Sequence, residues 1–213
     1  MGIPERKLRE RAAMKKIILD AAYALYSEKG LNFTTIRKIA EKIDYSPTTV
    51  YLYYPNKDLI FYDMQKLAFE SLLTALRASD AETDAFCRLN NLGKTYIDFG
   101  IQNPEKYDLM FLLRFPMNAV GSNQPWGNFQ KTFQYLQSVI NECITEKPVI
   151  FTDPLTGSLQ FWSFLHGLTS LYLKDRLPDY CDYDPQNLNP VYQAWEGFME
   201  SVRFASGRRQ ENV

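Results

Sequence analysis

Several hydroxyl-bearing residues near position 50 have the types and spacing needed to contact a nucleic acid. Ser46 is a favoured helix N-cap and Pro47 suits the first helical position, so a short helix is predicted to begin here. On that helix Pro47, Thr48 and Tyr51 share one face and Thr49 flanks it. Hydroxyl groups can bond to phosphates and base edges, and a threonine methyl can contact the thymine methyl. This face suits DNA binding, although an ordinary helical unit with a solvated polar face would look the same.

A second short helix is predicted just before this one, with Thr34 or Thr35 as its N-cap. Its apolar residues recur at helical spacing, at Ile36, Ile39, Ala40 and Ile43. A tight turn follows near Asp44, where one residue needs a positive φ, which Asp tolerates. Beyond the turn, Val50 and Leu52 are expected to point inward. The two helices are therefore predicted to form a helix-turn-helix.

Longer helices are predicted on both sides of this pair. The first runs from about residue 4 to residue 29 and ends at Gly30, a favoured residue just past a helix. The other has Asn56 as its cap and continues to about Ala78, a length of roughly 30 Å. Its first turn places the ammonium of Lys57 and several backbone amides where a phosphate could bind.

Charge is segregated along the chain. Residues 1–57 contain eleven Lys or Arg and six Asp or Glu, a net charge of +5, whereas the remaining residues carry a net charge of −6. Such a basic segment would steer one end of the molecule toward phosphates, with an affinity that falls as salt rises. The basic side chains are densest at Arg6, Lys7, Arg9, Arg11, Lys15 and Lys16. They could contact DNA, or they could form only the solvated face of the first helix.

A resemblance to the DNA-binding domain of the TetR family of bacterial transcriptional regulators rests on the stretch TTIRKIAEKIDYSPTTVYLYYPNKDLI. The similarity runs from Ala12 to Ile60, and one departure is Asp44, where most members have Gly. The resemblance implies base contacts from Pro47, Thr48, Thr49 and Arg37. It implies phosphate contacts from Thr35, Tyr51, Tyr53 and Lys57. It also implies a homodimer that binds a double-stranded DNA operator. A helical ligand-binding and dimerisation domain is expected to follow the DNA-binding domain.

The rest of the chain is predicted to be helical too. Helices are expected over residues 82–102, from Pro104 onward, over residues 126–146, from the cap Asp153 to about residue 175, and over residues 190–206. The predicted fold is therefore all-α with about nine helices. We expect a helix-turn-helix domain over residues 1–55 and a ligand-binding and dimerisation domain over residues 56–213.

Aromatic residues make up 15% of the chain, and many fall on these later helices. A mostly apolar cavity is the usual site for a small hydrophobic or aromatic ligand. The candidate ligand-binding residues are Phe99, Tyr107, Met110, Phe111, Trp126, Phe129, Phe133, Trp162 and His166. The alternative for the aromatic residues is an ordinary core, and for His166 a packed, hydrogen-bonded position. The segments QNPEKYDLMF and FWSFLHGLTSLYL also resemble the C-terminal domain of one TetR branch, whose signature is a Trp followed four residues later by His-Gly.

The last two predicted helices carry more apolar residues than one buried side requires. The first has Leu159, Trp162, Leu165, Leu168, Leu171 and Leu173, and the second has Val191, Trp195, Phe198, Met199 and Val202. The family resemblance implies that this pair of helices forms a homodimer interface with its copy.

Several classes of function are not expected. No apolar run reaches eighteen residues and the N-terminus lacks the apolar core of a signal peptide, so we expect no membrane span and a cytoplasmic location. Cys87, Cys143 and Cys181 form no C-x-x-C motif, and a lone histidine cannot build a multi-histidine metal site. No catalytic constellation is visible, so neither an enzyme nor a cofactor is predicted.

These observations favour a sequence-specific DNA-binding transcriptional regulator, a ligand-responsive repressor that binds a palindromic operator as a dimer. Two alternatives stay open. One is a helical small-molecule-binding protein or enzyme whose N-terminal helix-turn-helix has only a structural role. The other is a DNA-binding regulator controlled by a protein partner.

Overall fold

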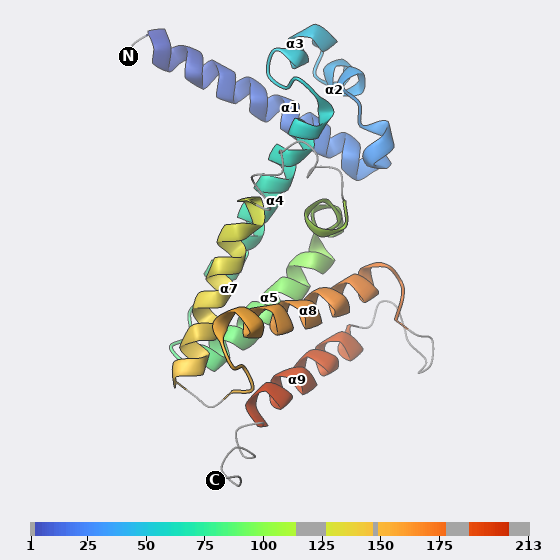
Figure 1. Ribbon diagram of the computed structural model, residues 1–213. Coiled ribbons are helices and arrows are strands. Elements are labelled where there is room, and N and C mark those ends of the chain that lie inside the picture. Colours follow the sequence, from blue (N-terminus) through green and yellow to red (C-terminus); the bar gives the residue numbers. More distant parts are fainter. Residues whose placement is uncertain (1–2, 114–126, 147–148, 178–187, 205–213) are drawn as a thin grey trace. The chain divides into compact units, whose positions relative to one another are not determined.

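The computed structural model describes residues 3–113, 127–146, 149–177 and 188–204, and these are mostly helical (Figure 1). Within these ranges there are nine α-helices and one π-helical turn, and no strand. The predicted all-α fold is therefore confirmed. No helix that the structure describes combines the length and the apolar character needed to cross a bilayer.

Contacts divide the chain into two compact units, and the first contains the described residues of Met1–Phe69 and Glu105–Asn128. Its helices are α1 (Ile3–Phe33), α2 (Ile36–Lys42), α3 (Pro47–Tyr51) and the first half of α4 (Lys57–Ala78). It also includes most of α6 (Pro104–Tyr107) and the π-helical turn η1 (Asp108–Leu112). Helix α2 packs against both α1 and α3.

The second unit contains the described residues of Glu70–Pro104 and Phe129–Val213. It holds the second half of α4, α5 (Ala85–Gln102), nearly all of α7 (Gly127–Glu146), α8 (Pro154–Leu173) and α9 (Asn189–Phe204). Helix α5 packs against both α8 and α9, and α8 packs against α9, as Figure 1 shows.

This division differs from the boundary expected between residues 55 and 56. Residues 105–112 lie in the first unit because the buried side-chain amide of Gln65 donates to the carbonyls of Leu109 and Met110, at 3.2 and 3.3 Å. The Phe69 and Phe111 rings meet edge to face at 5.4 Å. Burial, together with the carboxylates of Asp108 and Glu105, also raises the pKa of Tyr26 on α1 to about 12. Sequence periodicity could not reveal these contacts because they join segments about forty residues apart or more.

The helix ends of the first unit follow the sequence signals closely. Gly30 has a φ of 77° and kinks α1 at the residue where the helix was expected to end, but α1 continues beyond it to Phe33. Thr35 and Ser46 are the N-caps of α2 and α3. Asp44 has a φ of 58°, so the turn between the two helices uses the positive φ that was expected there.

Trp195 of α9 lies at the centre of the second unit. Its side chain is fully buried and its indole N–H donates to Asn90 Oδ1 at 2.8 Å. Its ring meets Phe161 edge to face at 5.3 Å. Val191, Met199 and Val202 are buried as well. Most of the apolar residues of α9 are thus packed within the unit.

Candidate DNA interface and ligand pocket

Helix α3 presents a polar, exposed face. Val50 is fully buried, whereas Pro47 and Thr48 are exposed and the Tyr51 side chain has 53% of its surface exposed. Ser46 Oγ accepts a hydrogen bond from the Thr49 backbone N–H at 3.1 Å, which fixes the first turn of a helix too short to be stable alone. The structure therefore places the hydroxyl of Thr48 and the ring of Tyr51 at the surface.

Leu52 was expected to point inward, and this is wrong, because 71% of its surface is exposed. Helix α3 ends at Tyr51 and Leu52 is its C-cap, so the next inward position falls on Tyr54, four residues after Val50. Tyr54 is buried and its hydroxyl donates to Asp63 Oδ2 at 2.8 Å. Burial, followed by this contact, raises the pKa of Tyr54.

The start of α2 lies beside the start of α3 and borders an open groove. Thr35 Oγ1 accepts a hydrogen bond from the Lys38 backbone N–H at 3.2 Å, and Arg37 is exposed. The groove has a volume of about 510 Å³ and is lined by Thr35, Arg37, Lys38, Glu41, Tyr45 and Pro47. Three residues predicted to contact DNA are thus brought together at one surface: Thr35, Arg37 and Pro47.

Two basic residues of α1 lie over tyrosines that follow α3. The Arg11 guanidinium lies 5.9 Å from the centre of the Tyr53 ring, and Lys15 Nζ lies 4.5 Å from that of Tyr54. Lys15 is also 3.7 Å from Asp63 Oδ2. These contacts join the basic N-terminal helix to the helix-turn-helix, and they leave Tyr53 half-buried.

Lys57 occupies a more enclosed position than expected. Its ammonium donates to the carbonyl of Leu31, near the end of α1, and lies 5.2 Å from the centre of the Phe61 ring. Partial burial lowers its pKa. The structure therefore gives Lys57 a role in joining α4 to α1, and its contact with phosphate stays a prediction.

A small cavity lies within the second unit, between α4, α5, α7 and α8. Its volume is about 30 Å³, enough for about one or two water molecules. It is lined by Leu72, Leu76, Leu92, Tyr96, Phe129, Thr132, Phe133, Tyr135, Leu136, Phe161, Trp162 and Leu165. None of these side chains carries a charge at neutral pH, so the cavity favours apolar contents.

Three of the predicted ligand-binding residues line this cavity. The Phe129 and Trp162 rings lie 4.8 Å apart, and Phe133 lies 5.4 Å from Phe129. Thr132 and Tyr135 also line it but were not among the predicted residues. Helical spacing carries a signal for Thr132, because Thr132 and Phe133 follow Phe129 by three and four residues and so lie on the same face of the helix.

His166 is connected to the cavity through Tyr96. Its Nδ1 lies 3.3 Å from the Tyr96 hydroxyl, which also accepts a hydrogen bond from Trp162 Nε1 at 3.3 Å. Burial lowers the pKa of His166, so the imidazole is neutral at pH 7. The histidine is thus a hydrogen-bonded, partly buried residue, and direct contact with a ligand stays a prediction.

The remaining predicted residues lie elsewhere. Phe99 is buried in the second unit but does not line the cavity. Tyr107, Met110 and Phe111 belong to the first unit, where the Tyr107 and Phe111 rings are 5.0 Å apart. Trp126 lies outside the described residues. Tyr107, Met110 and Phe111 therefore do not line the cavity of the second unit, because the segment after Pro104 packs in the first unit.

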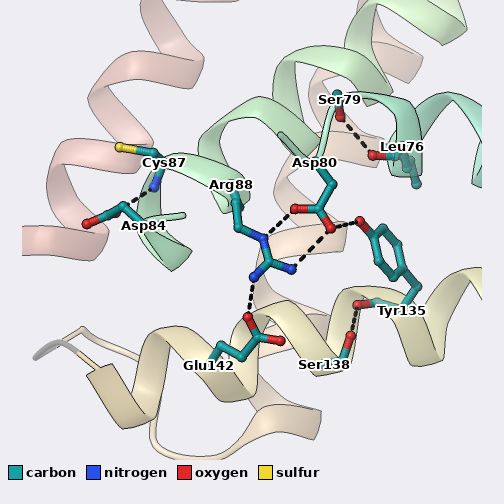
Figure 2. A network of polar contacts seen from close by, with 9 residues as sticks. All are labelled: Leu76, Ser79, Asp80, Asp84, Cys87, Arg88, Tyr135, Ser138 and Glu142. Atoms are coloured by element: carbon teal, nitrogen blue, oxygen red, sulfur yellow. Dashed lines mark hydrogen bonds and ion pairs between the residues drawn. The ribbon is translucent and has the colours of Figure 1, made fainter. Parts of the chain in front are cut away.

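A cluster of charged side chains lies next to the cavity wall, and Figure 2 shows Asp80 between Arg88 and Tyr135. Arg88 Nη2 donates to Asp80 Oδ2 at 3.1 Å, Arg88 also pairs with Glu142, and the Tyr135 hydroxyl donates to Asp80. Burial alone would raise the pKa of Asp80, but the hydrogen bonds from Arg88 and Tyr135 and the guanidinium charge lower it. The cluster therefore joins the end of α4 to α5 and α7.

In the described part of the chain, no group of three or more His, Cys, Asp or Glu side chains is placed to hold a metal ion. Cys87 is exposed, and Cys143 is buried with its pKa raised to about 12 by burial and by Glu146 and Glu142. A buried thiol with a high pKa is unreactive at neutral pH.

Comparison with known protein families gives two matches. Residues 18–64 match the tetR family of bacterial regulatory proteins. Residues 89–189 match the tetracyclin repressor-like C-terminal domain. Together the two matches cover more than half of the chain.

Two curated relatives are similar in sequence. The chain is 27% identical over 103 residues to the nucleoid occlusion factor SlmA of Haemophilus influenzae (strain PittGG), covering 48% of this chain and 46% of SlmA. The match thus spans less than half the length of that relative. It is 25% identical over 161 residues to IcaR of Staphylococcus aureus (strain Newman), the HTH-type negative transcriptional regulator of the biofilm operon icaADBC, covering 76% of this chain and 83% of IcaR.

Solved structures share the fold. A protein of unknown function from Rhodococcus sp. RHA1 has a TM-score of 0.73 and 16% identity, covering 89% of this chain and 95% of that chain. A regulatory protein of the tetR family from Rhodococcus RHA1 has a TM-score of 0.64 and 21% identity, covering 88% and 96%.

Proposed function

Because the chain belongs to the TetR family of bacterial regulatory proteins, we propose that it is a sequence-specific DNA-binding transcriptional repressor whose operator affinity a small ligand lowers. The observation that carries this proposal is the exposed face formed by the start of α2 and by α3, with Arg37, Pro47, Thr48 and Tyr51 at the surface. The site of action is the bacterial cytoplasm, where operator DNA is found.

The short helix α3 is the element that enters the major groove. Its N-terminal residues Pro47, Thr48 and Thr49 read base edges, together with Arg37 at the start of α2. Thr35, Tyr51, Tyr53 and Lys57 contact phosphates and fix the position of the helix. The net charge of +5 in residues 1–57 supports this orientation, because it favours approach of the first unit to DNA.

The protein acts as a homodimer through α8 and α9. Leu155, Leu159 and Leu171 of α8 are exposed by 53%, 46% and 46%, although each is large and apolar. A second copy would remove this surface from water. Two-fold symmetry then presents two copies of α3 to a palindromic operator, with half-sites about 34 to 36 Å apart or somewhat more.

The effector is a small hydrophobic or aromatic molecule bound in the cavity of the second unit. Helix α4 links this cavity to the first unit in sequence, since Leu72 and Leu76 line the cavity and residues 57–69 belong to the first unit. A ligand changes operator affinity only by its differential affinity for the two states of the protein. A tenfold loss of operator affinity requires about 1.4 kcal/mol of coupling.

Fluorescence polarisation tests the DNA-binding part of this proposal. Labelled DNA from immediately upstream of the protein's own gene, and a labelled scrambled fragment, are each titrated with the purified protein at low and at physiological salt. We expect a preference for the upstream fragment that persists at the higher salt. Equal binding to both fragments that vanishes with salt would contradict specific recognition of that fragment, because charge alone would then account for the binding.

A further inference from the structure

One hydroxyl group on the wall of the cavity has no hydrogen-bond partner. Thr132 of α7 lines the cavity and is buried, with 6% of its surface exposed, and its Oγ1 is unpartnered. Among the described residues the only other buried side-chain oxygen or nitrogen in this condition is Thr169 Oγ1, which is not on the cavity wall. An unpaired buried hydroxyl is unfavourable, so Thr132 calls for an explanation.

The backbone of α7 does not compensate for this hydroxyl. A threonine on a helix commonly donates to the carbonyl four residues earlier. Thr145 on the same helix does so, with Oγ1 2.8 Å from the Asn141 carbonyl, and Thr74 on α4 donates to Glu70 in the same way. Thr132 makes no such bond. Its hydroxyl is therefore available to a molecule inside the cavity.

The other polar groups on the cavity wall have partners within the protein. The Tyr96 hydroxyl is bonded to Trp162 and His166, and the Tyr135 hydroxyl donates to Asp80. The cavity wall offers no charged group to balance a charge on the ligand. Burial keeps His166 neutral as well.

We propose that Thr132 is the polar anchor of the effector site, and that the effector is an uncharged, mainly aromatic molecule with one hydrogen-bonding group that meets Thr132 Oγ1. This inference rests on the proposed function and specifies its ligand. The cavity of about 30 Å³ is far smaller than the roughly 300 Å³ or more of ordinary ligand pockets, so binding opens it. The wall residues Phe129, Phe133 and Trp162 move apart while Thr132 receives the polar group.

A matched pair of probes tests the anchor. 2-Naphthol and 2-methylnaphthalene have nearly the same shape, and only the first has a hydroxyl group. Their dissociation constants are measured by calorimetry or fluorescence competition with the wild-type protein and with Thr132→Val, which keeps the shape of the side chain. We expect the substitution to weaken 2-naphthol about tenfold and 2-methylnaphthalene less than about twofold, because one hydrogen bond is lost and a buried partner is left unpaired.

Three controls sharpen the result. Thr145→Val on the same helix removes a hydroxyl that is already bonded to the backbone, so it should leave both dissociation constants unchanged. The anion 2-naphthoate should bind at least about tenfold more weakly than 2-naphthol, because its charge would be buried without a partner. The melting temperature of unliganded Thr132→Val should equal or exceed that of the wild type, because an unpaired hydroxyl is removed.

Equal weakening of both probes by Thr132→Val would overturn the anchor, as would a failure of 2-naphthol to bind the wild type up to its solubility. A clear fall in the melting temperature of Thr132→Val would show that the hydroxyl already has a partner. Operator binding by the wild type without a probe is measured separately. If the protein binds its operator but Thr132→Val weakens both probes equally, only the anchor is rejected. If Thr132→Val weakens 2-naphthol selectively but the protein does not bind its operator, only the proposed function is rejected.

Discussion

Thr48, Thr49 and Tyr51 carry hydroxyl groups on one short helix, but they are expected to contribute differently to DNA binding. Thr48 and Thr49 lie in the first turn of α3, while Tyr51 is its last residue and is 53% exposed. We expect Tyr51→Phe to weaken binding of all DNA fragments about fivefold, because one phosphate contact is lost. Thr48→Ala and Thr49→Ala should instead change which base is preferred.

Binding of the three variants to a panel of operator fragments, each with one base pair changed, checks this difference. If all three substitutions lower the affinity for every fragment by the same factor, the assignment of base contacts to Thr48 and Thr49 and of a phosphate contact to Tyr51 is wrong.

Asp80 is the residue whose ionisation should affect stability most clearly. Its pKa is lowered in the folded state, so the carboxylate stabilises the fold at pH values above its unfolded pKa, near 3.8, and this contribution disappears as the pH falls through the lower folded value. At pH 7 we expect Asp80→Asn to reduce the free energy of unfolding by about 2 kcal/mol, because charged hydrogen bonds to Arg88 and Tyr135 are lost.

Urea unfolding of both proteins at several pH values from 7 to 2 measures this effect. The difference between wild type and Asp80→Asn should be nearly constant above pH 5 and should shrink below about pH 4. Asp20→Asn is the control, since Asp20 pairs with Lys16 at an exposed site on α1 and should change stability by less than about 0.5 kcal/mol. A difference that stays constant down to pH 2 would refute the assigned role of the Asp80 carboxylate.

At the scale of elements, the packing of α5 against α9 depends on Gly93. A Cβ added to Gly93 would lie 2.1 Å from Cζ2 of the buried Trp195 ring. We expect Gly93→Ala to reduce the free energy of unfolding by about 1 to 3 kcal/mol, despite the better helix propensity of Ala, because the indole cannot move without disturbing the core.

Gly197 on α9 gives the matched comparison, because a Cβ there has no atom within 4 Å. Gly197→Ala should leave stability unchanged or raise it by up to about 1 kcal/mol. Chemical denaturation measures both variants under the same conditions. Equal destabilisation by the two substitutions would mean that glycine flexibility, and not the Trp195 contact, is important.

Local signals predicted most of the elements but not all of their packing. Ser46 with Pro47 and Asp153 with Pro154 marked helix starts correctly, because caps depend on neighbouring residues alone. The π-helical turn Asp108–Leu112 was expected to be part of an ordinary α-helix. Its carbonyls bond to Gln65, a contact 44 and 45 residues away that no periodicity reveals.

The candidate site was predictable to a similar extent. The surface positions of Arg37, Pro47 and Thr48 follow from the helix pattern, and Phe129, Phe133 and Trp162 do line the cavity. The Asp80–Arg88–Glu142 cluster could not be found, because its members are 8 and 54 residues apart and meet only through tertiary packing. Helical spacing places Thr132 on the face of Phe129 and Phe133, but its unpartnered hydroxyl is visible only in the structure.

At the scale of the whole molecule, dimer formation should depend on α8. Leu159 is large, apolar and 46% exposed near the middle of the exposed leucines. We expect Leu159→Glu to shift the protein from dimer to monomer and to weaken operator binding at least about tenfold, because a charge would be buried in the interface and avidity would be lost. Analytical ultracentrifugation and fluorescence polarisation measure the two effects.

Leu67 provides a control, since it is a large residue on α4 that is 50% exposed. Leu67→Glu changes the same charge on a surface outside the proposed interface, so it should leave the protein dimeric. A dimeric Leu159→Glu protein would move the interface away from this part of α8.

The Gln65 contacts bear on how hybrid regulators should be constructed. A chimera joined at residue 55 would carry the helix-turn-helix but leave behind Gln65, Phe69 and the segment around Leu109 and Met110 that packs with them. Foreign residues would then have to recreate a buried amide and an aromatic pair. A chimera that keeps residues 3–69 together with residues 105–112 transfers the helix-turn-helix with the residues that pack against it. The part of this molecule that can be exchanged is therefore discontinuous in sequence.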